Sequence, residues 1–315
     1  MKPTDDRITW LLSAQTPSIV YQTRRDLRAS RSPAHQIQKA KKQILLTGAV
    51  PAILSRQATG GNWKIDHGFY GPKFYSAHWS MVLLAELGTD GKDDRFRRGV
   101  EYMLDATRDL VRKGLETKNY GWSCLFGNIL RYALQAPVRT DSRVENLIHF
   151  SARAMADGPC ECRSNHGRAC AWGAVRTLWG LAAVPKRART KEVNEAIRRG
   201  IRFLLEDNRL EKADYPVPPK GRINPLWFKL SFPLFYHADI LFTLRVLDEL
   251  EALDHRGARA ALDWLAAKRK ENGRWKGTSP FRRRTWRELG DPEETDRWVS
   301  LQALRILGHA GRPVM

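Results

Sequence analysis

The stretch DGPCECRSNHGRACAWGAVRTLWGL (157–181) holds three of the four cysteines of the chain, and an apolar run begins directly at the last of them, Cys170. Cys124 lies 46 residues before Cys170, and His78 lies another 46 residues before Cys124. Each of the three begins a similar apolar run: HWSMVLLAELG, CLFGNILRYAL and CAWGAVRTLWGL. The equal spacing indicates an internal repeat that carries a metal-ligand type of residue at one position.

Apolar residues recur mostly every three or four positions, as at Ile197, Ile201 and Leu204, which predicts an all-α protein. Two short helices are expected at 6–14 and 18–29. The rest of the chain reads as helical hairpins, each a polar helix followed by a more apolar one. The polar helices are expected at 33–57, 93–108, 141–156, 190–206 and 255–270, and their partners at 75–88, 122–136, 170–184, 234–252 and 297–309.

Five such hairpins and an N-terminal pair indicate a helical repeat array. The second helix of each hairpin is apolar on most sides, which suits an inner layer enclosed by an outer one. We therefore expect an α/α toroid of about five to six helical hairpins over residues 33–315, with the helix pair of 1–32 packed on the ring. The long loops 207–232 and 276–295 are expected to cover a binding face.

The net charge of +20 is unevenly distributed. Residues 24–42 hold seven Lys or Arg against one acid, and residues 268–287 hold nine against Glu271. Such segments attract nucleic acid, anionic lipid or phosphorylated substrates, although a high arginine content can also reflect the genome or growth temperature of the source. A nucleic-acid partner is therefore one prediction.

The chain has no apolar run near the ~20 residues of a membrane span, and its first residues do not resemble a signal peptide. We expect a cytoplasmic protein. Four cysteines with C-x-C-x7-C spacing then favour reduced thiols or metal ligation over disulfides. Neither an oligomeric state nor a protein partner is predicted.

QATGGNW (57–63) and KRKENGRW (268–275) resemble the Q-x-x-x-G-x-W repeats of squalene and hopene cyclases and of protein prenyltransferase β subunits, with Lys or Arg replacing Gln in the second. The segments ELG (86–88) and ALRILG (303–308) are similar to inner helices of that family. The likeness covers about residues 33–310, and it is greatest to small bacterial squalene-cyclase-like or prenyltransferase-like repeat proteins. It implies an α/α toroid and, if the chain is an enzyme, a prenyltransferase-like or cyclase-like transferase or lyase.

Two departures from that family limit what the resemblance implies. The D-x-D-D acid motif of class II cyclases is missing, since Asp90-Gly-Lys-Asp93-Asp94 does not match it, so cyclisation by that acid is disfavoured. The D-x-C zinc pair of protein prenyltransferases is missing as well. The catalytic residues of the family are therefore not transferred to this chain.

A metal site follows instead from the repeat. Residues at the same position of successive inner helices lie side by side, so His78, Cys124 and Cys170 should be neighbours, and Cys162 precedes Cys170 in a loop at the same end. Three thiolates and one imidazole are a common tetrahedral Zn²⁺ set, and an iron–sulfur cluster is the alternative cofactor. Buried cysteines can also be simple core residues.

Further candidates lie close to the same position. The fourth hairpin places Asp239, preceded by His237, at about the phase of the cysteines, and both are candidates for catalysis. Cys160 and His166 are spare metal ligands within the cysteine-rich loop.

A second series consists of one arginine on each of four apolar helices. These residues are Arg131, Arg176, Arg245 and Arg305. Facing a central cavity, they would bind phosphate, diphosphate or nucleic acid. Alternatively, they pair with acids of the outer helices, since a buried unpaired arginine is costly.

The leading hypothesis is a toroid protein with a central ligand cavity and a thiolate-rich zinc site at one mouth, acting on an isoprenoid or another anionic hydrophobic molecule. One alternative is a nucleic-acid-binding or nucleic-acid-modifying protein that uses the basic segments. The other is a non-catalytic interaction scaffold whose interior is filled by side chains.

Overall fold

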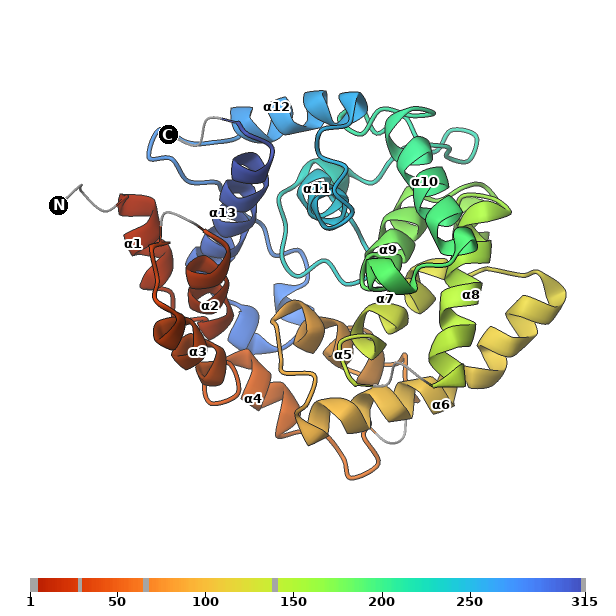
Figure 1. Ribbon diagram of the computed structural model, residues 1–315, viewed down its shortest axis with the longest axis horizontal. Helices are drawn as coiled ribbons and strands as arrows, with labels where there is room; N and C mark the ends of the chain where they lie inside the picture. Colours follow the sequence, from red (N-terminus) through yellow and green to blue (C-terminus); the bar gives the residue numbers. More distant parts are fainter. Residues whose placement is uncertain (1–4, 28–29, 65–67, 138–140, 313–315) are drawn as a thin grey trace.

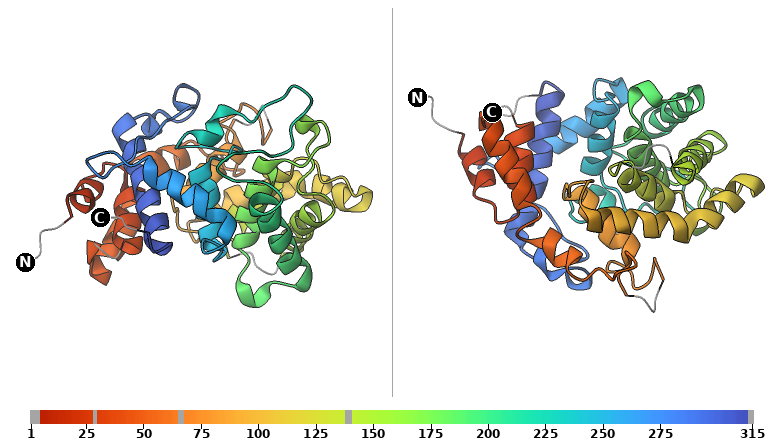
Figure 2. Two further views of the ribbon diagram at one scale, coloured as in Figure 1. Left: turned by 90° about the horizontal axis from the view of Figure 1, so that it is seen from above. Right: turned by 60° about the horizontal axis from the view of Figure 1, so that its bottom comes forward.

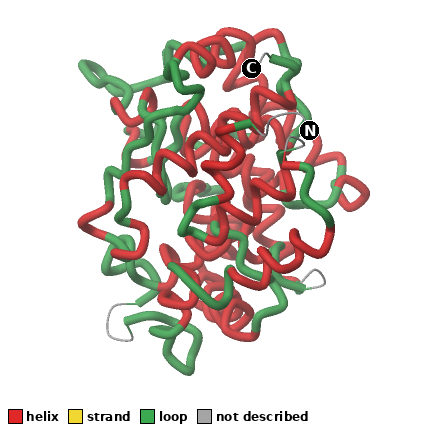
Figure 3. The backbone as a smooth tube through the Cα atoms, turned by 90° about the vertical axis from the view of Figure 1, so that its left-hand side faces the viewer, coloured by secondary structure: helices red, strands yellow, loops and turns green. Residues whose placement is uncertain are grey.

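The computed structural model describes residues 5–27, 30–64, 68–137 and 141–312. Within these ranges the secondary structure is helical, with thirteen α-helices and short 3-10 turns, and no strand is formed beyond two isolated bridges (Figure 3). The predicted all-α class is confirmed. No helix in these ranges has the length and apolar character needed to cross a membrane.

The N-terminal part has four short helices. They are α1 (Asp6–Leu12), α2 (Pro17–Asp26), α3 (Ala34–Gln43) and α4 (Ala49–Leu54). The single helix predicted at 33–57 is therefore wrong, because Gly48 adopts a φ of 80° and separates α3 from α4. Gly48 also packs closely on Pro17, where an added Cβ atom would lie 3.2 Å from the proline ring.

The remaining helices follow the predicted alternation. They are α5 (Ala77–Glu86), α6 (Asp94–Thr117), α7 (Ser123–Ala133), α8 (Ser142–Ala156), α9 (Ala171–Ala182), α10 (Lys191–Leu205), α11 (Ile240–Glu249), α12 (Arg259–Ala267) and α13 (Pro292–His309). α6 continues beyond the predicted residue 108 and ends where Lys118 turns left-handed, at a φ of 52°. α11 begins later than predicted because Phe235 has a φ of 57° and Asp239 caps the helix.

Burial separates the helices into two kinds. Every residue of α5 is buried except Ala85, whereas α6 buries one stripe of its surface. Figure 1 shows α6, α8, α10 and α12 at the periphery and α5, α7, α9 and α11 nearer the centre, and Figure 2 shows the same chain from two further sides. This is the predicted arrangement of inner and outer helices. Closure into a toroid stays a prediction.

The two tryptophan motifs have the same local structure. The indole N–H of Trp63 donates to the carbonyl of Ile53 at 2.8 Å, and that of Trp275 donates to the carbonyl of Leu265 at 2.8 Å. Each tryptophan thereby fastens its loop to the preceding helix. The backbone N–H of Trp275 also donates to the Ser300 hydroxyl at 2.9 Å, which links this loop to α13.

α7 and α9 lie in unusually close contact. A Cβ atom on Gly127 would lie 2.4 Å from the carbonyl oxygen of Arg176, and one on Gly180 would lie 2.5 Å from the carbonyl oxygen of Gly127. Only glycine permits this approach of the two backbones. Cys124 and Cys170 lie at the starts of these two helices.

Candidate functional site

The repeated residues all lie at the starts of inner helices. His78 is the second residue of α5, Cys124 is the second residue of α7, and Cys170 is the N-cap of α9. Asp239 is the N-cap of α11. The 46-residue spacing thus corresponds to successive inner helices, as predicted.

The three cysteines predicted as metal ligands come together. Cys124, Cys162 and Cys170 line a cavity of about 620 Å³. Five aromatic side chains share its wall: Tyr70, Trp122, Trp172, Trp227 and Tyr236. Part of the wall comes from the long loop 207–232.

The charge of this thiol-lined cavity is one-sided. Lys73, Arg163 and Arg222 line it, and the described lining residues include no Asp or Glu. All three cationic residues are exposed, so they lie where the cavity meets solvent. The Lys73 ammonium lies 5.8 Å from the ring centre of Tyr70 and 5.3 Å from that of Tyr236. The cavity therefore joins an apolar, aromatic interior to a cationic rim.

Cys162 and Cys170 shift each other's pKa in opposite directions. Hydrogen bonding with Cys170 is the main cause that lowers the pKa of Cys162, to about 6. Burial opposes the shift, and the backbone N–H groups of Ser164 and Asn165 support it. The same bond, together with burial, raises the pKa of Cys170 well above its ordinary value. The pKa of Cys162 therefore lies below that of Cys170.

The other two cysteines have raised pKa values. Burial raises the pKa of Cys124 to about 12, and the neighbouring Cys162 and Cys160 add to the shift. Cys160 is fully buried, its thiol donates to the Thr177 hydroxyl at 3.3 Å, and burial raises its pKa to about 11. Cys162 is thus the sulfur that is ready to act as a nucleophile or a metal ligand.

The fourth predicted metal ligand is placed differently. The described residues that line the cavity do not include His78, which is fully buried and stacked on Tyr70 with ring centres 6.1 Å apart. The Tyr132 hydroxyl lies 3.5 Å from its Nδ1 atom. Burial lowers the pKa of His78 to about 3, so the ring is neutral. In the part of the chain that the structure describes, no three His, Cys, Asp or Glu side chains are arranged to hold a metal ion. Zinc and an iron–sulfur cluster stay predictions.

The two predicted catalytic residues lie at the start of α11, where Asp239 is the N-cap. The Asp239 carboxylate accepts from the backbone N–H groups of Phe242 at 2.7 Å and Ser231 at 2.8 Å, and burial raises its pKa to about 7. Nδ1 of His237 lies 3.2 Å from the carbonyl oxygen of Leu234, and burial lowers its pKa to about 4. Neither residue is among the described lining of the cavity.

The four predicted phosphate-binding arginines also lie outside the described cavity wall. Three pair with acids on other helices, as the alternative interpretation expects, but the acids belong to inner helices and to the end of α2. The partners are Glu249 for Arg131, Glu86 for Arg245 at 2.8 Å, and Asp26 and Asp248 for Arg305 at 3.7 and 3.4 Å. Arg176 donates from Nε to the carbonyl of His237 at 2.9 Å and lies over the ring of Phe242.

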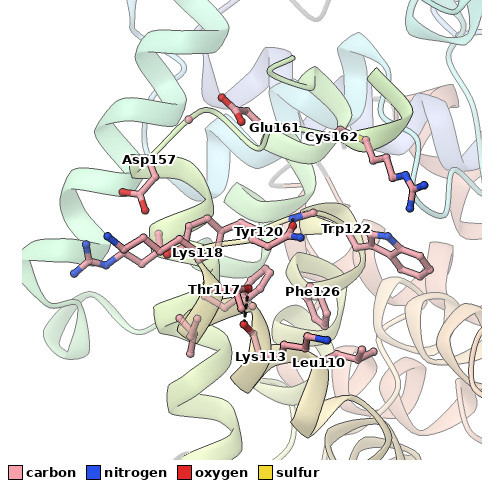
Figure 4. A pocket seen from close by; sticks show the side chains of 18 of the residues that line it. Leu110, Lys113, Thr117, Lys118, Tyr120, Trp122, Phe126, Asp157, Glu161 and Cys162 are labelled. Atoms are coloured by element: carbon pink, nitrogen blue, oxygen red, sulfur yellow. Dashed lines mark hydrogen bonds between the residues drawn. The ribbon is translucent and has the colours of Figure 1, made fainter. Parts of the chain in front are cut away.

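A larger groove adjoins the cavity (Figure 4). It has a volume of about 1420 Å³ and lies between the second half of α6, the α6–α7 loop, α8 and the cysteine-rich loop. His166, a spare ligand in the sequence, lines this groove. Trp122, Cys162 and Arg163 line both the groove and the cavity, so Cys162 is reached from two sides. The Trp122 side chain is 53% exposed.

Comparison with protein-family models, with curated proteins and with solved structures finds no match to this chain. The resemblance to cyclase and prenyltransferase repeats therefore stays a prediction. The three cationic residues of the cavity were not identified from the sequence. Lys73 and Arg222 lie in irregular segments and Arg163 begins a three-residue 3-10 turn, so no hydrophobic period indicates that these side chains converge.

Proposed function

We propose that this chain binds a small anionic molecule with an apolar or aromatic body in the thiol-lined cavity. The observation that carries the proposal is the composition of the wall: Lys73, Arg163 and Arg222 around a floor of aromatic rings, with no acid among the described lining residues. An isoprenoid diphosphate belongs to this class of ligand, as does an aromatic carboxylate.

The arrangement suits such a ligand physically. Aromatic side chains offer a large apolar surface to its body, and two guanidinium groups match the oxygens of a phosphate or carboxylate. Because Arg163 and Arg222 are exposed, neither is a buried charge when the cavity is empty. The anionic end is therefore expected at the rim and the apolar body inside.

The chemistry available to the bound molecule comes from Cys162. A thiolate in contact with a ligand cavity is a nucleophile for an electrophilic carbon or sulfur. It is also a strong ligand for zinc, and a zinc ion held by Cys124, Cys162 and Cys170 would compete with such chemistry for the same sulfur.

The proposal is tested by calorimetric titration with three probes: farnesyl diphosphate, farnesol and inorganic diphosphate. We expect farnesyl diphosphate to bind at least about tenfold more tightly than either of the others, because it alone uses both parts of the cavity. Arg222→Gln should weaken its binding by about tenfold. Arg187→Gln is the matched control, because Arg187 is exposed in the turn after α9, at the end of that helix opposite to Cys170. Equal binding of farnesol and farnesyl diphosphate, or equal effects of the two variants, would contradict the proposal.

A further inference from the structure

We infer that the loops around the thiol-lined cavity bind single-stranded nucleic acid, with phosphates on an exposed arginine triplet and one base inside the cavity. The arginine triplet consists of Arg282, Arg283 and Arg284, which form the 3-10 turn η7 (Arg282–Arg284). The base site rests on the proposed function, whereas the triplet adds a phosphate-binding surface outside the cavity.

The loops that precede four inner helices lie on one face of the molecule, which we call the loop face. It consists of residues 68–76, 157–170, 207–232 and 276–290. Hydrogen bonds join these loops: the Thr285 hydroxyl to the Phe74 carbonyl at 3.1 Å, the Phe232 N–H to the Thr278 carbonyl at 3.0 Å, and the Asn165 amide to the Pro216 carbonyl at 3.0 Å. The left view of Figure 2 shows the loops along one side of the chain.

The arginine triplet lies beside the cavity. The guanidinium of Arg284 is 5.1 Å from the ring centre of Phe74, which directly follows Lys73 of the cationic rim. The ring of Phe281, just before the triplet, packs on the same Phe74 ring with centres 4.5 Å apart. The triplet therefore extends the cationic rim of the cavity along the loop face.

The charge of the triplet is available to a ligand. All three side chains are exposed, and none of them forms an ion pair with another described residue. By contrast, Arg287 pairs with Glu288 at 3.7 Å. Residues 215–237 and 277–287 contain no Asp or Glu at all. An acid-free surface that carries several cationic groups attracts a polyanion, and guanidinium groups match the oxygens of phosphate.

The aromatic wall favours a single strand over a duplex. Tyr70, Trp172 and Tyr236 are half-buried in the cavity, and Trp122 is 53% exposed at the boundary with the groove. A base of a single strand can leave its neighbours and stack on such rings, whereas the bases of a duplex are paired and stacked on one another. Only an unpaired base can therefore enter the cavity.

The same wall argues against an anionic membrane as the partner. A protein that binds a lipid surface inserts apolar side chains that project beyond its cationic ones. Here the rings of Tyr70 and Tyr236 are less exposed than Lys73, which lies over both of them. Rings below a cationic rim suit a nucleotide, whose phosphate stays outside while its base goes in.

Fluorescence anisotropy on the full chain measures the binding of a labelled oligothymidylate of about 12 nucleotides and of a duplex of the same length. We expect the single strand to bind at least about tenfold more tightly than the duplex. Arg282→Gln combined with Arg283→Gln should weaken its binding by at least about tenfold. It should also reduce the slope of log K against log salt concentration by about 0.7 for each lost phosphate contact.

The matched control removes two exposed arginines from the opposite end of the inner helices. Arg187 lies in the turn η4 (Lys186–Ala188) after α9, and Arg256 lies in the turn η6 (Arg256–Ala258) after α11. Arg187→Gln combined with Arg256→Gln changes the net charge by the same amount and should leave the affinity for the oligonucleotide within about twofold. Equal losses in the two double variants would overturn the triplet as a specific contact surface.

Competition with farnesyl diphosphate tests the base site. A saturating concentration should displace the oligonucleotide from the wild-type chain, because both ligands occupy the cavity. Arg282→Gln with Arg283→Gln should keep the affinity for farnesyl diphosphate within about twofold, because the triplet is not among the described lining residues. An oligonucleotide that stays bound would overturn the placement of a base in the cavity.

The two proposals fail in different ways. Binding of farnesyl diphosphate without binding of the oligonucleotide would overturn the nucleic-acid interface and leave the proposed function in place. Absence of any preference for farnesyl diphosphate over farnesol would contradict the proposed function itself. Equal affinity for single strand and duplex would overturn the single-strand specificity. Tighter binding to vesicles of phosphatidylcholine and phosphatidylserine than to the oligonucleotide would overturn nucleic acid as the partner in favour of a lipid surface.

Discussion

Cys162 and Cys170 both line the thiol-lined cavity, and Cys162 also lines the neighbouring groove. The influence of Cys170 lowers the pKa of Cys162, whereas the pKa of Cys170 is raised. Burial raises the pKa values of Cys124 and Cys160. The chemistry of the cavity therefore depends on one sulfur.

The alkylation of Cys162 should follow an unusually acidic titration. Its rate with iodoacetamide should rise with a midpoint near the pKa of about 6, compared with the ordinary 9.0, and fall as the pH drops below that midpoint. Cys170→Ala removes the main cause of the shift and should move the midpoint upward, whereas Cys170→Ser keeps a donor and should move it less. A wild-type midpoint between about 8 and 9 would show that the thiol pair does not act in this way.

The buried ion pair of Glu86 and Arg245 should matter strongly for stability. The two groups lie 2.8 Å apart with side-chain exposures of 1% and 11%, so Glu86→Gln leaves a buried charge without its partner. We expect urea denaturation to give a loss of about 3 kcal/mol in the free energy of unfolding. Glu251→Gln, which breaks the exposed pair with Lys186, is the control and should cause no measurable change.

The double variant Glu86→Leu with Arg245→Met gives a second check on that pair. It removes both charges and should recover most of the lost stability, because no uncompensated charge remains. A double variant as unstable as the single one would assign the loss to packing of the Glu86 side chain.

Two glycine substitutions should change stability in opposite directions, one in the close contact of α7 with α9 and one at an open position of α13. Gly127→Ala places a Cβ atom 2.4 Å from the carbonyl oxygen of Arg176 and should destabilise the chain by about 2 kcal/mol. Gly308→Ala in α13 meets no atom within 4 Å and should stabilise the chain by about 0.5–1 kcal/mol through the higher helix propensity of alanine. Thermal unfolding measures both effects. A neutral Gly127→Ala would mean that the two helices separate easily.

The zinc prediction is decided by elemental mass spectrometry on protein purified without a metal-affinity tag. Zinc bound by the cysteines predicts about one zinc per chain, whereas free cysteines predict none and four titratable thiols after unfolding. About one zinc per chain, lost in both Cys124→Ser and Cys170→Ser, would instead support the metal site predicted from the repeat.

The sequence predicts which helices form this site, but it does not predict the cationic residues that line it. The spacing of His78, Cys124 and Cys170 correctly places them at the starts of successive inner helices, because a repeat fixes the phase of every helix. It does not fix how far each side chain reaches toward the cavity. Cys170 and Cys124, which is one repeat earlier in the sequence, line the cavity wall. His78 does not line it, because its ring is stacked on that of Tyr70.

The remaining differences have physical causes as well. Arg222 comes from a loop without a hydrophobic period, so nothing in the local sequence directs it to the cavity. Arg245 lies on an apolar helix, and the sequence therefore predicts a ligand-binding residue there. Its actual partner, Glu86, is 159 residues away in the chain, so the local sequence does not indicate the ion pair. Only the fold, which brings Glu86 of α5 and Arg245 of α11 to 2.8 Å from each other, reveals that the pair is satisfied internally.

The most direct test of the proposed cavity is protection of Cys162 from N-ethylmaleimide, measured by peptide mapping at pH 7 with and without ligand. Our account predicts that saturating farnesyl diphosphate slows the labelling of Cys162 by at least about tenfold, while farnesol at the same concentration does not. Labelling that is equally fast with both molecules, or equally slowed by both, would contradict an anion-selective cavity at the cysteine pair.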